Sequence, residues 1–399
     1  CRQLYGKVLE HSVTRLERFA SCAFAHFLQY GLKLAGRQIN EFEAVDFGNI
    51  LHDALEEYAK RMQAAGDDWF HVTPEHMRQY AKEAIESAIA ACTNAALVDG
   101  ERNIYLVRRM EKILCRTVEV LEYQIQSGSF VPENYEVAFQ YVNQLDAVRF
   151  TLSEEEKMHL RGRIDRMDIW EREQEVYVKV IDYKSGSTSF QLLSIYHGLQ
   201  LQLVVYLNAA MELMRRKYPK KEIRPAGIFY YHIDDPMIDD DGEELLEDEI
   251  KEQIFAKLKL YGYVNSDPQV YRAMDSGMQS SSKILPITVN KDGSLRKTSK
   301  AVTEEQFGVL SDYVNQKIAE LGQRMMRGEI AVNPYELDGR TPCGYCPYHS
   351  VCGFDLRIDG FDYRRLPKFD QASEIIEQMG KKDEEMNEGW KEELTGEEG

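Results

Sequence analysis

The 399-residue sequence has no long apolar run, and its acidic excess is concentrated in two stretches. No hydrophobic segment approaches the roughly 20 residues that a membrane-spanning helix needs, which argues against a membrane partner. The formal net charge is -18, but positions 234–250 alone hold ten acidic residues and no basic one. Positions 381–399 add eight acidic residues against three lysines. The remaining chain is therefore nearly neutral, and the acidic total does not exclude a nucleic-acid substrate.

A disulfide framework is also lacking, because the seven cysteines are odd in number and scattered. Three of them form a C-x2-C-x5-C cluster of Cys343, Cys346 and Cys352, and thiolates this close in tight loops are typical of a metal site. Zinc could take His349 as a fourth ligand, whereas a four-iron cluster needs a fourth cysteine, for which Cys22 is the candidate. With Cys22, the site would join the two ends of the chain, and metal binding would contribute to the folding free energy.

Periodicity divides the chain into a helical first third and a later part with strands. The first residue is Cys1 rather than methionine, so we expect a piece of a longer polypeptide, with room for a large core or two to three domains. Amphipathic periodicity predicts helices at 12–34, 46–65, 74–96 and 102–126. Runs of β-branched and aromatic residues then predict mainly antiparallel strands at 135–142, 148–152, 158–170 and 174–183.

The order of the next segments predicts a mixed sheet. A long helix at 190–217 is followed by an apolar strand at 226–232, and a strand, helix, strand succession indicates a crossover connection. A further helix is expected at 247–261, and a strand at 284–289 followed by the turn 290–293 predicts a hairpin with a basic second strand.

The last part of the chain combines a well-marked helix with an acidic tail. Thr303 and Gln306 form a capping-box pattern that opens this helix, and Gly328 is expected to close it. Beyond Ala372 the composition is acidic and poor in apolar residues, which predicts disorder.

Two apolar runs of strand character each end on an aspartate, Asp165 and Asp182, and Lys184 follows the second one closely. Carboxylates on neighbouring strands could hold a divalent cation for phosphodiester hydrolysis, and the lysine could stabilise developing charge or position the attacking water. His52 lies in the first turns of the expected helix 46–65 and offers a nitrogen ligand. A lone histidine at a helix start is more often simply polar, so the hypothesis depends on His52 together with both aspartates.

Gln202 and Tyr206 lie four residues apart, and therefore on one face of the expected helix 190–217. That helix should pack beside the strand that carries Asp182, which brings both side chains toward the same site.

With these residues taken together, the sequence resembles the RecB-type branch of the PD-(D/E)XK nucleases. The motifs that carry the resemblance are Gly48-x3-His52, Gly162-Arg163-Ile164-Asp165-Arg166, Val180-Ile181-Asp182-Tyr183-Lys184-Ser185-Gly186 and Gln202-x3-Tyr206.

The four cysteines, one upstream and three downstream of these motifs, resemble the iron-staple variant of that branch. The inserted helices and the opening Leu16-Glu17-Arg18-Phe19-Ala20-Ser21-Cys22 are most similar to the C-terminal nuclease domain of the AddB component of bacterial AddAB helicase-nucleases. The resemblance covers roughly residues 12–360. In one departure from the superfamily name, Ile164 rather than proline precedes Asp165.

The resemblance implies an α/β fold with a restriction-endonuclease-like core, in which helices flank a mixed central sheet. A helical insertion and a C-terminal iron-sulfur staple would complete it. We therefore expect five parts along the chain: an N-terminal helix with the first cluster cysteine (1–45), a helical part of the nuclease domain (46–130), the nuclease core with its acidic excursion 234–250 (131–335), a cysteine-rich iron-sulfur segment (336–371) and an acidic tail (372–399). The tail lies outside the resemblance, and its composition alone predicts disorder.

The resemblance also implies roles for individual residues. The implied ligands of Mg²⁺ or Mn²⁺ are His52, Asp165, Asp182 and the backbone carbonyl of Tyr183. Lys184 would assist the metal-activated water, and Gln202 and Tyr206 would orient the site or the DNA strand. The implied ligands of a [4Fe-4S] cluster with a structural role are Cys22, Cys343, Cys346 and Cys352.

The function implied is a cytoplasmic, Mg²⁺-dependent DNA exonuclease that acts during double-strand break processing for homologous recombination. Its substrate would be a single strand delivered by a helicase partner, an AddA-like helicase-nuclease protein. One alternative is a CRISPR-associated iron-sulfur exonuclease, which shares both sets of motifs but is usually more compact. Another is a catalytically silent, zinc-stabilised DNA-binding scaffold, which would have little reason to keep all of His52, Asp165, Asp182 and Lys184.

Overall fold

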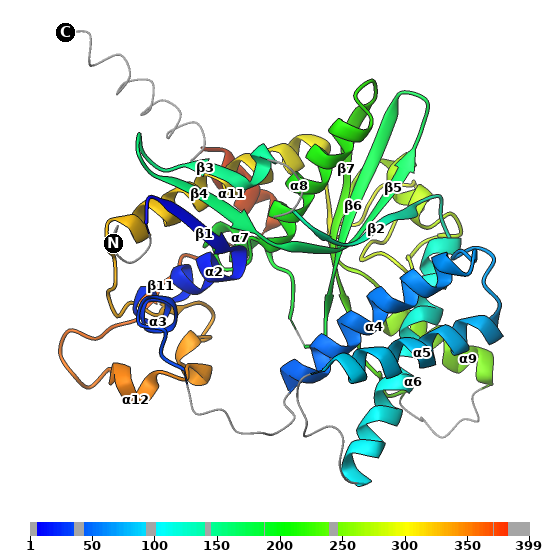
Figure 1. Cartoon of the computed structure of the whole chain (residues 1–399). Coiled ribbons are helices and arrows are strands. Elements are labelled where there is room, and N and C mark those ends of the chain that lie inside the picture. Colours follow the sequence, from blue (N-terminus) through cyan, green and yellow to red (C-terminus); the bar gives the residue numbers. More distant parts are fainter. Residues whose placement is uncertain are drawn as a thin grey trace.

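The computed structural model describes residues 6–35, 44–92, 101–139, 145–186, 188–238, 246–369 and 371–381. Its centre is a six-stranded sheet with the strand order β2-β5-β6-β7-β8-β9 (Figure 1). The strands are Val131–Ala138 (β2), Arg163–Glu171 (β5), Glu175–Lys184 (β6), Glu222–His232 (β7), Tyr261–Asn265 (β8) and Ala301–Val302 (β9). β5 pairs antiparallel with β2 and β6, whereas β6 and β7 are parallel, so the sheet is mixed as predicted.

Helices cover both faces of the central sheet (Figure 1). β6 shows why, because Val176 and Val180 pack into one buried cluster while Tyr177 and Ile181 pack into the other. A strand buried on both faces needs this near-continuous apolar sequence. One cluster includes residues of Val13–Ser21 (α2), Leu192–Tyr196 (α7), Gln202–Lys217 (α8) and Glu304–Met326 (α11). The other includes residues of Ala44–Ala64 (α4), Pro74–Ala91 (α5), Glu101–Gln126 (α6), Glu247–Lys257 (α9) and Pro268–Met274 (α10).

Two smaller sheets and a cysteine-rich segment adjoin the core. Val8–Ser12 (β1), Lys157–Arg161 (β4) and Arg149–Thr151 (β3) form a three-stranded sheet, and Tyr335–Glu336 (β10) pairs with Arg364–Arg365 (β11). The short helices Ala23–His26 (α3) and His349–Cys352 (α12) lie near each other, although one belongs to the N-terminal and the other to the C-terminal part of the chain (Figure 1). Within the described ranges, no helix is both long and apolar enough to cross a membrane.

Several predicted elements are interrupted in the structure. The strand predicted at 158–170 is wrong, because Gly162 separates β4 from β5 and the two strands belong to different sheets. The single helix predicted at 190–217 is also wrong, because a turn containing Gly198 at φ +77° divides it into α7 and α8. The hairpin predicted around the turn 290–293 is reduced to isolated bridges, one of which joins Val289 to Leu295 across that turn. Amphipathic periodicity continues across such breaks, and it therefore does not locate them.

The helix predicted at 12–34 is broken as well. Val8–Ser12 form β1, α2 ends at Ser21, and Cys22 is extended with φ -162° before α3 begins at Ala23. The Asn333 side chain accepts a hydrogen bond from the Ala23 backbone N–H at 3.1 Å, which stabilises this break. Cys22 therefore lies at a junction between helices, and not within a helix as expected.

Other predictions agree with the structure. The capping box of Thr303 and Gln306 opens α11 as predicted, and α8 is the crossover between β6 and β7. Disorder beyond Ala372 is wrong for residues 372–381, which form a helix whose Ile375 and Met379 side chains are buried in the core. The ends of the elements predicted at 74–96 and 135–142, part of the acidic excursion and the rest of the tail lie outside the described residues.

A buried ion cluster ties β5 to β6. Arg166 donates two hydrogen bonds of 2.6 Å to Asp168, and the Lys179 ammonium lies 3.2 Å from the same carboxylate. Burial acts to raise the pKa of Asp168, but Arg166 and Lys179 hold this pKa below its ordinary value. One carboxylate thus neutralises part of the charge of two buried cations, in the strands that carry the candidate site.

Candidate functional site

Three carboxylates lie in a row across the neighbouring strands β2, β5 and β6. The register of β2 and β5 places Glu136 opposite Asp165, between two paired positions, and the register of β5 and β6 places Asp165 opposite Asp182. Asp165 is the third residue of β5 and does not end its strand, contrary to the prediction. Because β5 and β6 are antiparallel, the start of one meets the end of the other, and the two predicted aspartates still come together.

His52 reaches this row from α4. Its Nδ1 lies 3.5 Å from Oδ2 of Asp165, and its ring packs edge-on against Tyr183. A side chain at Gly48 would bring a Cβ atom within 2.4 Å of the Ser185 Oγ, so the glycine lets α4 approach the end of β6. Burial lowers the pKa of His52, which favours the neutral imidazole that a metal requires.

Asp165 and Asp182 are both almost inaccessible to solvent. Oδ2 of Asp165 accepts a hydrogen bond of 2.8 Å from the backbone N–H of Tyr183. Burial raises the pKa of Asp165 to about 6. Burial, and next the Asp165 carboxylate, raise the pKa of Asp182 to about 7. Two neighbouring carboxyl groups resist ionising together because their negative charges repel. A cation bound between them would offset this electrostatic cost.

Lys184 lies between Asp182 and α8. Its Nζ is 2.5 Å from Oδ2 of Asp182 and donates to Oε1 of Gln202 at 3.2 Å. The Gln202 amide in turn donates to the Tyr206 hydroxyl at 2.7 Å. Burial raises the pKa of Tyr206, and the charge of Asp182 is the next largest cause. Hydrogen bonds therefore join Tyr206, Gln202 and Lys184, and Lys184 forms an ion pair with Asp182.

Glu136 is a member of the site that the sequence reasoning missed. Its side chain is only 3 % exposed and pairs with Arg163. Burial, and next the Asp165 carboxylate, raise its pKa to about 8. Its backbone has φ +51°, which is uncommon for a residue other than glycine. The signal available in the sequence was an acidic residue between Tyr135 and Val137 in an expected strand, but alternation alone makes such a residue solvent-facing.

The donor set suits a hard divalent cation. His52, Glu136 and Asp165 each offer one ligand atom, and these three atoms all lie within 4.8 Å of one another. Among the residues that the structure describes, no other three histidine, cysteine or acidic side chains meet this condition. Carboxylate oxygens with one imidazole suit magnesium or manganese. Asp182 faces the same group from β6, and the high pKa values of the three carboxyls mean that a bound cation would displace protons.

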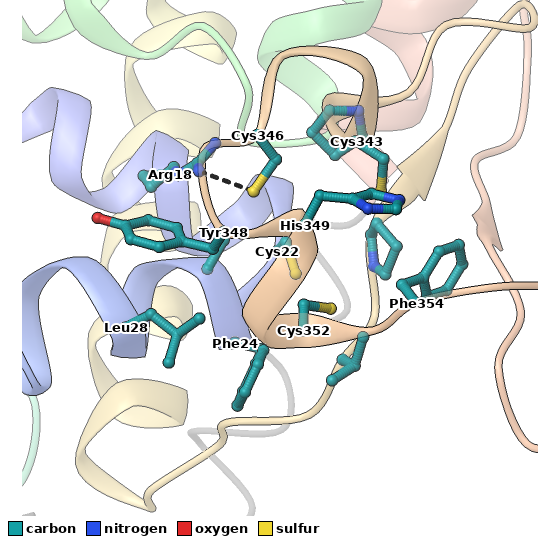
Figure 2. Close-up of a pocket in the computed structure, with 14 residues that line it drawn as sticks. Arg18, Cys22, Phe24, Leu28, Cys343, Cys346, Tyr348, His349, Cys352 and Phe354 are labelled. Atoms are coloured by element: carbon teal, nitrogen blue, oxygen red, sulfur yellow. Dashed lines mark hydrogen bonds between the residues drawn. The ribbon is translucent and has the colours of Figure 1, made fainter. Parts of the chain in front are cut away.

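The four predicted cluster cysteines line one pocket, although they come from opposite ends of the chain (Figure 2). Cys22 is 321 positions before Cys343. Nη2 of Arg18 donates to the Cys346 sulfur at 3.5 Å. Burial raises the pKa of the Cys343 and Cys352 thiols, and neighbouring pocket cysteines raise both further. A cationic metal centre would offset this cost by stabilising the thiolates.

The cysteine pocket offers donors for two kinds of metal site. Cys343, Cys346 and Cys352 with His349, which also lines the pocket, are a Cys3His set of the kind that binds zinc. With Cys22 in place of His349, the four thiols are the ligand set of a [4Fe-4S] cluster.

Comparison with known proteins agrees with this geometry. The sequence model of the PD-(D/E)XK nuclease superfamily matches residues 10–353. The chain is also similar to proteins that are named as one component of an ATP-dependent helicase/deoxyribonuclease. It is 40% identical to the protein of Lachnoclostridium phytofermentans over 393 residues, covering 96% of this chain and 32% of the relative. It is 37% identical to the protein of Caldanaerobacter subterraneus over 383 residues, covering 96% and 33%. The chain thus spans about a third of the length of these curated relatives.

Proposed function

The chain belongs to the PD-(D/E)XK nuclease superfamily, and we propose that it hydrolyses DNA phosphodiesters with Mg²⁺ or Mn²⁺. The observation that carries the proposal is the convergence of His52, Glu136 and Asp165, with Asp182 and Lys184 beside them. A family match alone gives the fold, whereas these side chains supply the chemistry of a metal-dependent nuclease.

His52, Asp165, Asp182 and the backbone carbonyl of Tyr183 would hold the cation, and Glu136 is an additional candidate ligand. When bound, the cation would polarise the phosphoryl group and lower the pKa of the attacking water. The Lys184 ammonium would stabilise the negative charge that develops on the phosphate oxygens. Gln202 holds Lys184 by its side-chain oxygen, and Tyr206 holds Gln202 in turn. Both residues would therefore orient the lysine toward the scissile phosphate.

We further propose an exonuclease acting on a single strand that a helicase partner supplies during double-strand break processing. The relatives are named as components of an ATP-dependent helicase/deoxyribonuclease, which supports a DNA substrate and a helicase partner of the AddA kind. This substrate would place the activity with the DNA in the bacterial cytoplasm.

The cysteine pocket, in this proposal, holds a structural [4Fe-4S] cluster. The presence of four cysteines in one pocket supports iron, because a four-iron cluster takes four thiolate ligands. Anaerobic purification should give a brown protein with broad visible absorption and about four irons per chain. A colourless preparation with stoichiometric zinc would overturn the iron assignment.

The nuclease proposal is tested by incubating end-labelled single-stranded DNA with the chain and Mg²⁺. Asp182→Ala should abolish cleavage, whereas Asp292→Ala, in an exposed turn, should leave it unchanged. Circular dichroism would check that both variants are folded. Cleavage that survives Asp182→Ala would remove Asp182 from the mechanism. A folded wild type that binds DNA and Mn²⁺ without cutting would instead support the scaffold alternative.

A further inference from the structure

Helix α2 lies between the cysteine pocket and the carboxylate site. Arg18 on this helix donates to the Cys346 sulfur (Figure 2). The backbone carbonyl of Arg18 accepts a hydrogen bond from the Cys22 backbone N–H at 3.1 Å. The carbonyl of Ala20 accepts a hydrogen bond from Arg364 of the C-terminal segment. The end of α2 is therefore attached to the segment that carries three of the four pocket cysteines.

Glu17, the neighbour of Arg18, is directed toward the nuclease site. Its Oε1 accepts the backbone N–H groups of Leu201 at 2.6 Å and Gln202 at 3.2 Å. These are the first N–H groups of α8, and Leu201 at the N-cap position makes no side-chain capping bond. A carboxylate at this position satisfies unpaired donors and complements the positive end of the helix dipole. Glu17 thus caps a helix that begins 185 positions later.

The first residue of α8 is also the one that holds the catalytic lysine. Gln202 contributes its backbone N–H to Glu17 and its side-chain oxygen to Lys184, whose Nζ contacts Asp182. A shift of this first turn would therefore move the hydrogen-bond partner of Lys184. Contacts of only two other residues, Gln202 and Lys184, thus connect Glu17 to Asp182.

We infer that Glu17 is a positioning residue, which fixes the first turn of α8 and thereby holds Lys184 beside Asp182. The next residue of α2, Arg18, contacts the cysteine pocket. A change in the packing of that pocket would therefore move α2, and with it the first turn of α8. The inference rests on the proposed nuclease function for its effect on catalysis. The capping role itself can be measured without any cleavage.

The first experiment compares Glu17→Ala with Glu17→Gln in the 399-residue chain. Glu17→Ala should lower kcat on single-stranded DNA about tenfold with little change in KM, because the loss of about one net hydrogen bond displaces Lys184 without removing a DNA contact. Glu17→Gln should stay within about twofold of wild type, since its amide oxygen can accept the same bonds. Glu305→Ala, which removes an exposed carboxylate from the first turn of α11, should have no effect.

The second measurement is amide hydrogen exchange of the peptide covering residues 198–206. Exchange at Leu201 and Gln202 should accelerate in Glu17→Ala but not in Glu17→Gln, at unchanged visible absorption of the cysteine site. Unchanged exchange in Glu17→Ala would overturn the capping role. Faster exchange with unchanged kcat would overturn the positioning role. An inactive wild type would instead contradict the proposed nuclease function, while the exchange rates would still decide the cap.

A third variant tests the transmission from the cysteine pocket. Arg18→Met keeps the length of the side chain but removes the donor to Cys346, and it should also accelerate exchange at the start of α8. Arg78→Met, at an exposed position on α5, serves as the matched control. If hydrogen exchange at the start of α8 is the same in Arg18→Met as in Arg78→Met, the proposed coupling between the cysteine pocket and α8 is wrong.

Discussion

Oδ2 of Asp165 accepts a hydrogen bond from the backbone N–H of Tyr183, the residue after Asp182. This bond holds the carboxylate at the start of β5 against the end of β6, where the second aspartate lies. The two carboxyl groups share a site from which water is largely excluded, and the pKa of each is raised. Two ionised carboxylates in this site are unfavourable without a bound cation. We therefore expect this electrostatic cost to affect both metal affinity and the pH dependence of stability.

Metal affinity should depend on Glu136, which the sequence did not identify. Glu136→Gln should weaken Mn²⁺ binding about tenfold, or about 1.4 kcal/mol, because it removes one carboxylate charge from the ligand group. Titration of free Mn²⁺ by electron paramagnetic resonance would measure this. Glu133→Gln, on the same strand but paired with Lys217, is the control. Equal affinity in both variants would show that the Glu136 carboxylate is not a ligand.

Stability of the metal-free chain should fall as the pH rises. Burial raises the pKa of Asp182 from 3.8 to about 7, so the folded chain binds this proton more tightly than the unfolded chain. The associated stability is fully present below about pH 4 and is lost between about pH 4 and pH 7. Asp182→Asn should therefore stabilise the chain by about 2 kcal/mol at pH 8 in EDTA, and by less at pH 5.

Urea unfolding at the two pH values would measure this change, with Asp292→Asn at an exposed position as the control. Saturating Mn²⁺ should reverse the order of stability, since only the wild type keeps the Asp182 ligand. A variant that is less stable than wild type at pH 8 in EDTA would contradict the unfavourable charge assigned to Asp182.

The cysteine pocket should hold the two ends of the chain together. Cys22→Ala should abolish the visible absorption and lower the free energy of unfolding by about 5 kcal/mol, the order expected for a cross-link that closes a loop of about 100 residues or more. Cys92→Ala, at the C-cap of α5 and outside the pocket, is the matched control. Calorimetry under anaerobic conditions would compare them. An unchanged melting temperature in Cys22→Ala would refute the long-loop closure.

The buried ion cluster makes a separate prediction about the core. Asp168→Ala should destabilise the chain by about 3 to 5 kcal/mol, because it leaves the charges of Arg166 and Lys179 buried without their partner. Glu173→Ala, in the exposed turn between the same two strands, should change stability little. Urea unfolding measures both, and equal midpoints would mean that the cluster does not need its carboxylate.

Local sequence predicted those features whose cause is local. The capping box at Thr303 depends on groups three residues apart, and the four-residue spacing of Gln202 and Tyr206 puts both on one helix face. The strands also followed from apolar runs, because β6 is buried on both faces. The turn at Gly198 and the break at Cys22 were missed, since packing and partners such as Asn333 fix them.

The sequence by itself indicated the nuclease family, which the family comparison confirms, and it predicted the motif residues from His52 to Tyr206 and the cysteine set. These features were recognisable because they are residue types at fixed spacings. Tertiary structure alone decided that Glu136 faces Asp165 and that Glu17 caps α8, since both relationships join residues that are distant in the sequence. Strand register and helix packing set such partners, and periodicity within one segment carries no information about either.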